Sequence, residues 1–195
     1  MRTLVSFALI TIVFVAGCAS TKIETSGALP KEPLCRAGKS VLSTLVYWGP
    51  QWRPDQKEPQ LREAAALRGI HDFLNRASCI AIIGVHRLSL EKQQPSNNDL
   101  FRLASNTATE PEQILFIAVR ELGPRLVIGI PAIVEGGTEV LIDVRVLNPQ
   151  TSESLANTQT LWRNGGKFVI KGVNTLDQDI SSALSSVYMT NNVGK

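Results

Sequence analysis

The spacing of hydrophobic residues changes along this 195-residue chain from a helical to an alternating pattern. Within residues 60–77, Leu67, Ile70 and Leu74 recur at intervals of three and four, which predicts an amphipathic helix. Residues 139–147 instead alternate between apolar and polar side chains, which predicts a strand with one buried face. The chain is therefore expected to combine helices and strands.

Apolar runs bounded by turn residues predict the remaining elements. Thr109 and Glu112 match a capping box at the start of one helix, with Pro111 in its first turn, and Gly123-Pro124 ends that helix. The expected strands span residues 41–48, 79–90, 126–134, 139–147 and 155–163, and the expected helices span residues 60–77, 99–105, 109–122 and 175–188.

Segments rich in glycine, asparagine and proline are expected to separate the later strands. We interpret two of these segments as turns, Glu135-Gly136-Gly137-Thr138 and Asn148-Pro149-Gln150-Thr151. We interpret the third, Asn164-Gly165-Gly166, as a break in a strand. The order β-α-β-α-α-β-β-β-α predicts a single α/β domain with a mixed β-sheet, parallel early and meandering late. We place this domain at residues 39–190, followed by a disordered tail at residues 191–195.

The N-terminus has the pattern of an export signal. Arg2 precedes an apolar run at residues 4–15, which is shorter than the ~20 residues of a membrane-spanning helix and ends in small residues. We assign residues 1–17 to a signal peptide and residues 18–38, which lack periodicity, to a flexible tether.

Val15-Ala16-Gly17-Cys18 resembles the lipobox of bacterial lipoproteins. The resemblance implies diacylation of the Cys18 thiol, as with palmitate, then cleavage before Cys18 and acylation of the new N-terminus. In that family an Asp after the cysteine favours retention in the inner membrane. Ala19 occupies this position, which favours the outer membrane, with the domain facing the periplasm. An ordinary secretory signal next to a cysteine is the alternative.

The two other cysteines, Cys35 and Cys79, are expected in an oxidising periplasm, where a pair of thiols is commonly bridged. Cys35 precedes the first expected strand and Cys79 opens the second. If these strands are parallel neighbours, their starts lie side by side and a disulfide is possible. Two buried free thiols are the alternative, because Cα separation cannot be read from sequence.

Charge and motif content restrict the possible functions. The chain has 20 basic and 17 acidic residues without a basic block, which argues against nucleic acid as a partner. Its two histidines, His71 and His86, have no cysteine or acidic partner at metal-ligand spacing, and no serine-hydrolase elbow occurs. We therefore expect a non-enzyme without a cofactor or metal. The rival, an envelope enzyme or small-ligand carrier, would need a cleft around Glu58, Glu63 and His71.

Two aromatic clusters are candidate contact surfaces for a partner or a membrane. The first lies at the end of a strand and the second surrounds a turn, where aromatic and cationic side chains suit a membrane interface. For each cluster the alternative is packing onto the core, with Trp48 or Trp162 buried. The candidates are Tyr47, Trp48, Trp52, Arg53, Trp162, Arg163, Lys167 and Phe168.

The element order behind a lipid anchor resembles a domain shared by several envelope proteins. They are the N-terminal part of the Tol–Pal translocation protein, the curli secretion channel lipoprotein, the Pel exopolysaccharide lipoprotein and the lipoprotein activator of penicillin-binding proteins. The resemblance covers residues 41–188 and is best at residues 112–163, where an alternating strand ends in Asn148-Pro149-Gln150-Thr151. It departs from the family pattern after the first strand, at Trp48-Gly49-Pro50-Gln51-Trp52. The resemblance implies protein partners and homo-oligomers, and no reaction.

These patterns predict a non-catalytic outer-membrane lipoprotein that serves a cell-envelope machine for secretion, polysaccharide export or wall synthesis. Its expected partners are outer-membrane lipid, through acylated Cys18, an envelope protein complex and further copies of itself. A transporter-associated auxiliary lipoprotein is a further alternative that differs mainly in its partner.

Overall fold

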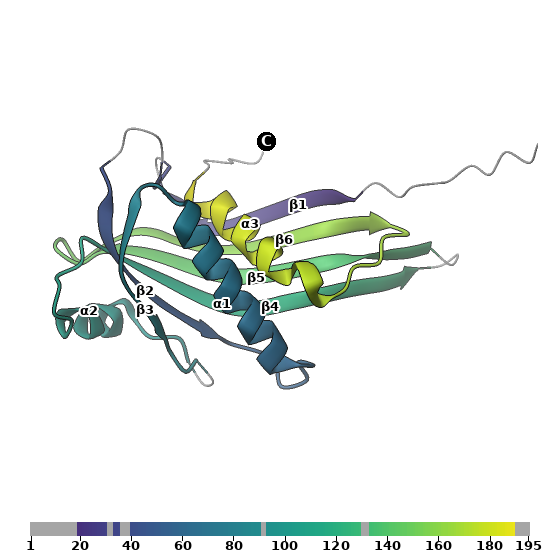
Figure 1. Ribbon diagram of the computed structural model, residues 1–195, viewed down its shortest axis with the longest axis horizontal. Helices are drawn as coiled ribbons and strands as arrows, with labels where there is room; N and C mark the ends of the chain where they lie inside the picture. Colours follow the sequence, from purple (N-terminus) through teal and green to yellow (C-terminus); the bar gives the residue numbers. More distant parts are fainter. Residues whose placement is uncertain (1–18, 31–32, 36–39, 91–92, 130–132, 190–195) are drawn as a thin grey trace, which may run out of the picture.

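The computed structural model describes residues 19–30, 33–35, 40–90, 93–129 and 133–189. These residues form one α/β domain around a mixed six-stranded sheet of order β1-β6-β5-β4-β2-β3, which confirms the expected fold class (Figure 1). The strands are β1 (Ser20–Ala28), β2 (Leu42–Pro50), β3 (Ile80–Arg87), β4 (Gln113–Gly129), β5 (Ile133–Asn148) and β6 (Glu153–Lys167). The helices are α1 (Pro59–Arg76), α2 (Asn97–Ser105), the short 3₁₀ helix η1 (Val173–Thr175) and α3 (Leu176–Tyr188).

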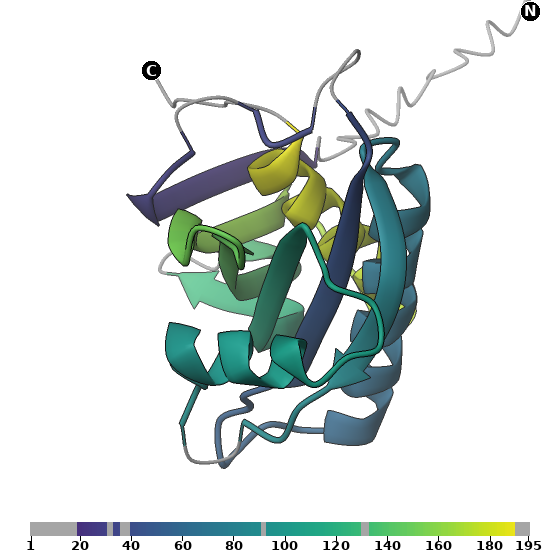
Figure 2. The ribbon, with the colours of Figure 1, turned by 90° about the vertical axis from the view of Figure 1, so that its left-hand side faces the viewer.

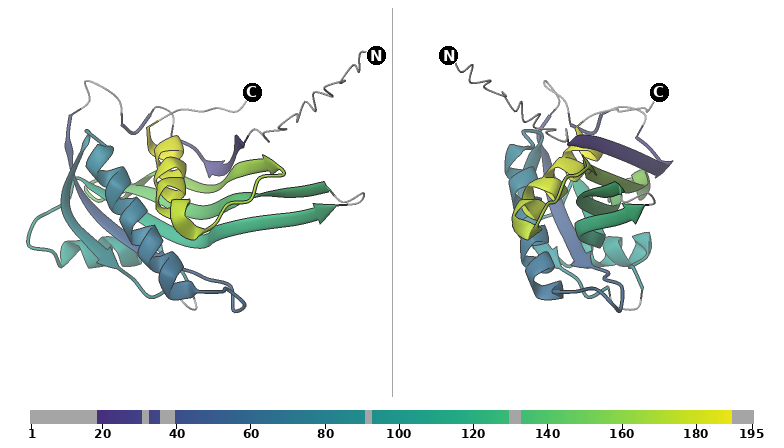
Figure 3. Two further views of the ribbon diagram at one scale, coloured as in Figure 1. Left: turned by 45° about the vertical axis from the view of Figure 1, so that its right-hand side comes forward. Right: turned by 90° about the vertical axis from the view of Figure 1, so that its right-hand side faces the viewer.

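Helices α1 and α3 pack side by side on one face of the sheet (Figure 3). Gly69 allows their close approach, because a Cβ there would lie 2.1 Å from Ile180 Cγ2. Phe73 of α1 meets Tyr188 of α3 edge to face at 5.6 Å. Under these helices lie alternate side chains of the strands, including Trp48, Ile117, Val140, Ile142 and Trp162. This layer is the main core of the domain.

Helix α2 covers a smaller area on the opposite face of the sheet, near the start of β4 (Figure 2). Leu100 and Ala104 of α2 pack on Phe116 of β4 and Leu147 of β5. The Ser96 hydroxyl accepts a hydrogen bond from the backbone N–H of Asp99, and the Asp99 carboxylate accepts one from the Ser96 N–H, a capping box that starts α2. The Ser96 hydroxyl also donates to the Asp99 carboxylate at 2.7 Å, and this bond, together with the one from the Ser96 N–H, holds the pKa of Asp99 below its ordinary value.

Cys35 and Cys79 form a disulfide with a Cα–Cα distance of 5.5 Å. The parallel pairing of β2 with β3, in which Leu42 faces Ile80, brings the starts of the two strands together as expected. The bond joins positions 44 residues apart, so the chain-entropy model assigns it about 4 kcal/mol of stabilisation. Of the two alternatives for these cysteines, the disulfide is confirmed.

The helix expected at residues 109–122 is wrong, because β4 begins at Gln113 and continues to Gly129. Every residue from Gln113 to Val119 is buried between neighbouring strands and the two helix layers, so tertiary packing overrides the local capping signal. Glu112 has a different role. Its carboxylate accepts hydrogen bonds from the N–H and hydroxyl of Ser43, which join the start of β4 to β2 and lower the pKa of Glu112.

The turn expected at residues 135–138 and the break expected at residues 164–166 are also wrong. Gly137 of β5 pairs with Gly165 of β6, and both strands continue past this pair. A Cβ on Gly165 would lie 2.1 Å from the carbonyl oxygen of Gly136, so glycine permits close strand contact here rather than a turn. The turn at residues 148–151 is confirmed, with Asn148 Oδ1 accepting from the N–H of Gln150.

The chain from Ser20 to Ala28, expected within the flexible tether, forms edge strand β1. It pairs antiparallel with β6 over its whole length, from Ser20 opposite Gly165 to Ala28 opposite Asn157. Its side chains are nearly all exposed, which explains why no hydrophobic pattern marks it in the sequence. The expected signal peptide, Cys18 and the expected disordered tail lie outside the described residues.

Candidate functional site

Strands β4, β5 and β6 extend beyond the helices to one end of the molecule, which we call the distal end (Figures 1 and 3). Arg62 of α1 marks the limit of helix cover over β4. It is buried and donates hydrogen bonds to the carbonyl oxygens of Lys57 and Leu122. Strand β2 pairs with β4 only as far as Val119, so the rest of β4 has a free edge that accommodates Pro124.

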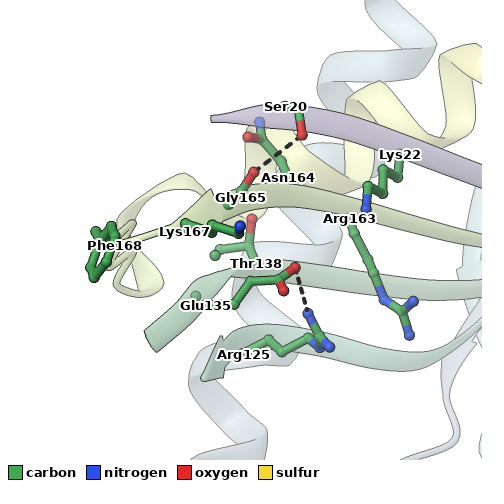
Figure 4. A pocket seen from close by; sticks show the side chains of 13 residues that line it. Ser20, Lys22, Arg125, Glu135, Thr138, Arg163, Asn164, Gly165, Lys167 and Phe168 are labelled. Carbon is green, nitrogen blue, oxygen red and sulfur yellow. Dashed lines mark hydrogen bonds and ion pairs between the residues drawn. The ribbon is translucent and has the colours of Figure 1, made fainter. Parts of the chain in front are cut away.

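A groove of about 510 Å³ crosses β1, β6, β5 and β4 at this end (Figure 4). Because side chains alternate along strands, Arg163 and Glu139 point to the open face, whereas their neighbours Trp162 and Val140 point toward the helices. We call this the distal groove, and it is lined by Ser20, Lys22, Arg125, Glu135, Gly136, Gly137, Thr138, Arg163, Asn164, Gly165, Gly166, Lys167 and Phe168.

The floor of the distal groove is backbone, because four glycines on β5 and β6 contribute no side chain. Gly137 has φ of +154° and lies opposite Gly165, and a Cβ on Gly137 would lie 2.3 Å from the carbonyl oxygen of Asn164. Larger residues at these positions would clash with the adjacent strand. The glycines are therefore required for strand contact, and they also leave the floor flat.

The walls of the distal groove carry both paired and unpaired cations. Arg163 Nε donates to Glu139 Oε2 at 2.6 Å, and this hydrogen bond raises the pKa of Arg163. Arg125 Nε lies 3.7 Å from Glu139 Oε2, and Arg125 Nη1 lies 3.8 Å from Glu135 Oε1. Lys22 and Lys167 are exposed, and within the described chain neither has an ion pair. These two ammonium groups are the charges available to a negatively charged ligand.

Beyond the groove, large apolar side chains are exposed at the end of β4 and after β6. We call this set the apolar tip: Leu126, Val127, Ile128, Phe168 and Ile170. Ile128 lies opposite Val134 of β5, and the N–H of Phe168 donates to the carbonyl oxygen of Val134 at 2.8 Å. The two segments therefore lie on either side of one residue of β5.

The structure separates the predicted contact residues into three groups. Tyr47, Trp48 and Trp162 are 4%, 2% and 3% exposed, so their expected direct contact with a partner or membrane is wrong. They lie on inward-facing positions of strands, where burial of aromatic surface dominates. Arg163, Lys167 and Phe168 line the distal groove.

The other two predicted contact residues lie after β2, away from the groove. Trp52 is partly buried against the core. Arg53 is exposed and lies 3.0 Å from Glu121. This segment therefore presents one charged side chain rather than an aromatic surface.

Sequence reasoning missed much of the distal site. Lys22 was assigned to the tether, and Arg125 and Leu126 were placed next to an incorrect helix end. Ile128 and Ile170 look like ordinary strand residues in the sequence, because their exposure depends on where helix cover ends. The β-branched residues Thr21, Ile23 and Thr25, at alternate positions, are the one local signal that could have indicated a strand here.

The residues of the rival enzyme hypothesis do not converge. Glu58 and His71 are exposed, and Glu63 forms an ion pair with Arg87. The ring of His86 packs against the ring of Tyr47, with their centroids 5.6 Å apart. Among the described residues there is no group of three or more side chains suited to a metal ion. No helix in the described part of the chain is long and apolar enough to cross a membrane.

Comparison with known proteins finds similarity in architecture at very low sequence identity. No family model matches the chain, and no curated protein matches it. A PelC dodecamer structure from Paraburkholderia phytofirmans aligns with 10% identity, covering 88% of this chain and 100% of that chain, with a TM-score of 0.44. Protein XCC0632 from Xanthomonas campestris aligns with 14% identity over 80% and 87% of the two chains, with a TM-score of 0.40.

Lipoprotein GNA1162 from Neisseria meningitidis aligns with 13% identity, covering 74% of this chain and 97% of that chain, with a TM-score of 0.35. At these values the similarity identifies neither a family nor a shared ligand.

Proposed function

We propose that the chain is a non-catalytic lipoprotein of the bacterial outer membrane that faces the periplasm and serves as an accessory or assembly component of a cell-envelope machine. The process served would be secretion, polysaccharide export or wall synthesis. Acylated Cys18 would confine the domain to the membrane surface and raise its effective concentration near membrane partners.

The observation that carries this proposal is the Cys35–Cys79 disulfide. Persistent disulfides are typical of oxidising compartments such as the bacterial periplasm. The chain has three cysteines, so this bond leaves Cys18 as the one remaining thiol. Cys18 stands at the end of the export-signal pattern, where lipidation requires a free thiol. The disulfide and the lipobox-like sequence thus support the same location independently.

Mass spectrometry of the mature protein from bacterial membranes tests the proposal. We expect the first residue to be Cys18, carrying acyl chains on its sulfur and its amino group. A Cys18→Ala variant, the matched control, should lack these groups and leave the membrane fraction. Finding an unmodified Cys18, or an N-terminus at another residue, would contradict the proposed anchor.

The proposed role in an envelope assembly needs a separate experiment. Chemical crosslinking in intact cells, followed by purification of the chain, should capture a membrane or periplasmic protein. The capture should decrease in Cys18→Ala, because that variant is no longer held near the membrane. Light scattering of the purified chain tests association between copies. A monomer without any crosslinked protein would contradict the assembly role while leaving the anchor intact.

A further inference from the structure

The most exposed large apolar side chains of the described chain gather at one place. Ile170 is 83% exposed, Ile128 73%, Phe168 63% and Leu126 58%, and all four belong to the apolar tip. Scattered single apolar residues on a surface are ordinary, but this concentration of exposed apolar side chains at one end of a sheet indicates an interaction surface.

The apolar tip is held in place by backbone contacts. Phe168 has φ of +60°, a conformation rare for bulky residues, and its N–H is bonded to the carbonyl oxygen of Val134. The N–H of Val169 donates to the carbonyl oxygen of Gly166 at 3.3 Å, which closes the turn after β6. This turn directs an apolar ring outward in a defined orientation.

The position of β1 places the anchoring residue, Cys18, close to the apolar tip. Ser20, the first residue of β1, pairs with Gly165, two residues before β6 ends. Cys18 is only two residues before Ser20, and two extended residues reach at most about 7 Å. An acyl group on Cys18 would therefore hold the distal end of the sheet against the bilayer, because only a short segment separates Cys18 from β1.

We infer that the apolar tip enters the phospholipid surface to which Cys18 is anchored, an inference that rests on the proposed lipidation. Apolar side chains beside cations are the composition that binds in the plane of a membrane interface. Lys167, which precedes Phe168, and Lys22, which lies opposite Arg163, line the groove and lack ion pairs within the described chain (Figure 4). Cations on this side of the sheet would be attracted by lipid phosphates. Arg163 and Arg125 are occupied by Glu139 and Glu135.

This contact would orient the whole domain. Strand β5 runs from the apolar tip to the turn at residues 148–151 and β6 returns from that turn to the tip, so the turn would point away from the membrane. A single acyl anchor permits rotation, whereas a second contact fixes the face that meets a partner. The end carrying α2 would then project into the periplasm, available to other proteins.

Fluorescent labelling of the mature lipoprotein tests the inference. Cys35 and Cys79 are bonded and Cys18 is acylated under the proposal, so an introduced cysteine is the one free thiol. The test variant is Ile170→Cys and the matched control is Thr151→Cys, exposed at the opposite end of β5, which is about 50 Å long. Both carry an environment-sensitive fluorophore in vesicles of phosphatidylethanolamine and phosphatidylglycerol.

We expect the label at position 170 to shift its emission to the blue and to be quenched severalfold more than the label at 151 by lipids with a nitroxide on the acyl chain. Adding Lys22→Glu and Lys167→Glu should reduce that quenching. Equal quenching at both positions, in protein whose acylation is confirmed by mass spectrometry, overturns the inference but not the proposed function.

Two further outcomes would also overturn the membrane contact. Absence of acyl groups on Cys18 removes the anchor, and the proposed function fails with it. If the label at position 170 in an unacylated Cys18→Ser chain is shielded without vesicles, and light scattering shows a multimer, the tip binds a second copy of the chain. The proposed anchor is then tested separately by mass spectrometry of the unaltered protein.

Discussion

At the end of the sheet near α2, the strands are covered on both faces, with Ile117 buried under α1 and α3 and Phe116 buried under α2. At the distal end, the described strands continue past Leu122 and Val140 into a groove of charged side chains and an exposed apolar tip. One set of strands thus supplies a rigid core at one end and a contact surface at the other. A functional contact surface is therefore expected at the distal end, where α1 and α3 no longer cover the sheet.

The comparison predicts that aromatic residues at the two ends have very different effects on stability. Trp48→Ala should destabilise the domain by about 3–5 kcal/mol, because it leaves a large cavity in the core. Phe168→Ala should change the free energy of unfolding by less than about 0.5 kcal/mol, because its ring is exposed. Urea unfolding of both variants measures this difference. Similar losses in the two variants would refute the division into core and contact surface.

Asp179, in the first turn of α3 where helix cover begins, is expected to have a smaller effect on stability, and this effect depends on pH. Asp179 is 4% exposed, and burial raises the pKa of its carboxyl above the ordinary value, although Thr175 donates a hydrogen bond to it and Lys171 lies nearby. At pH values between the unfolded and folded pKa, the folded state therefore keeps a proton that the unfolded state releases. Stability contributed by this group decreases as pH rises from its unfolded pKa through its folded pKa.

Asp179→Asn should remove that part of the pH dependence. The amide keeps an oxygen acceptor for Thr175 and carries no charge, so the variant should gain stability relative to the unaltered protein as pH rises from about 4 to 7. Urea midpoints measured across this range provide the test. Parallel pH profiles for the two proteins would show that the buried carboxyl of Asp179 does not contribute to the pH dependence of stability.

The smallest expected effect concerns the backbone at the apolar tip. Phe168→Gly should leave stability unchanged or raise it by up to about 1 kcal/mol, because glycine adopts φ of +60° without steric cost. The same change should reduce membrane contact. Thermal unfolding and vesicle quenching of the label at position 170 measure the two effects. A marked loss of stability would show that the ring is part of the core.

Local patterns predicted some elements accurately and others poorly. The helix at residues 60–77 and the turn after Asn148 were predictable, because amphipathic spacing and Asn-Pro chemistry are local signals. Residues 113–122 were not, since a continuously apolar run is compatible with helix or buried strand. In the candidate site, Arg163, Lys167 and Phe168 were identified from composition, while Lys22 and the end of β4 were not.

The amino-acid sequence alone specified the α/β class, the export-signal pattern ending at Cys18 and the pair of cysteines that could be bridged. These are properties of spacing and residue type within short segments. The tertiary structure decided that residues 20–28 join the sheet, that Trp48 and Trp162 are interior, and that the distal end is uncovered. Exposure depends on which helices reach which part of a strand, and that reach is a long-range property that no local pattern encodes.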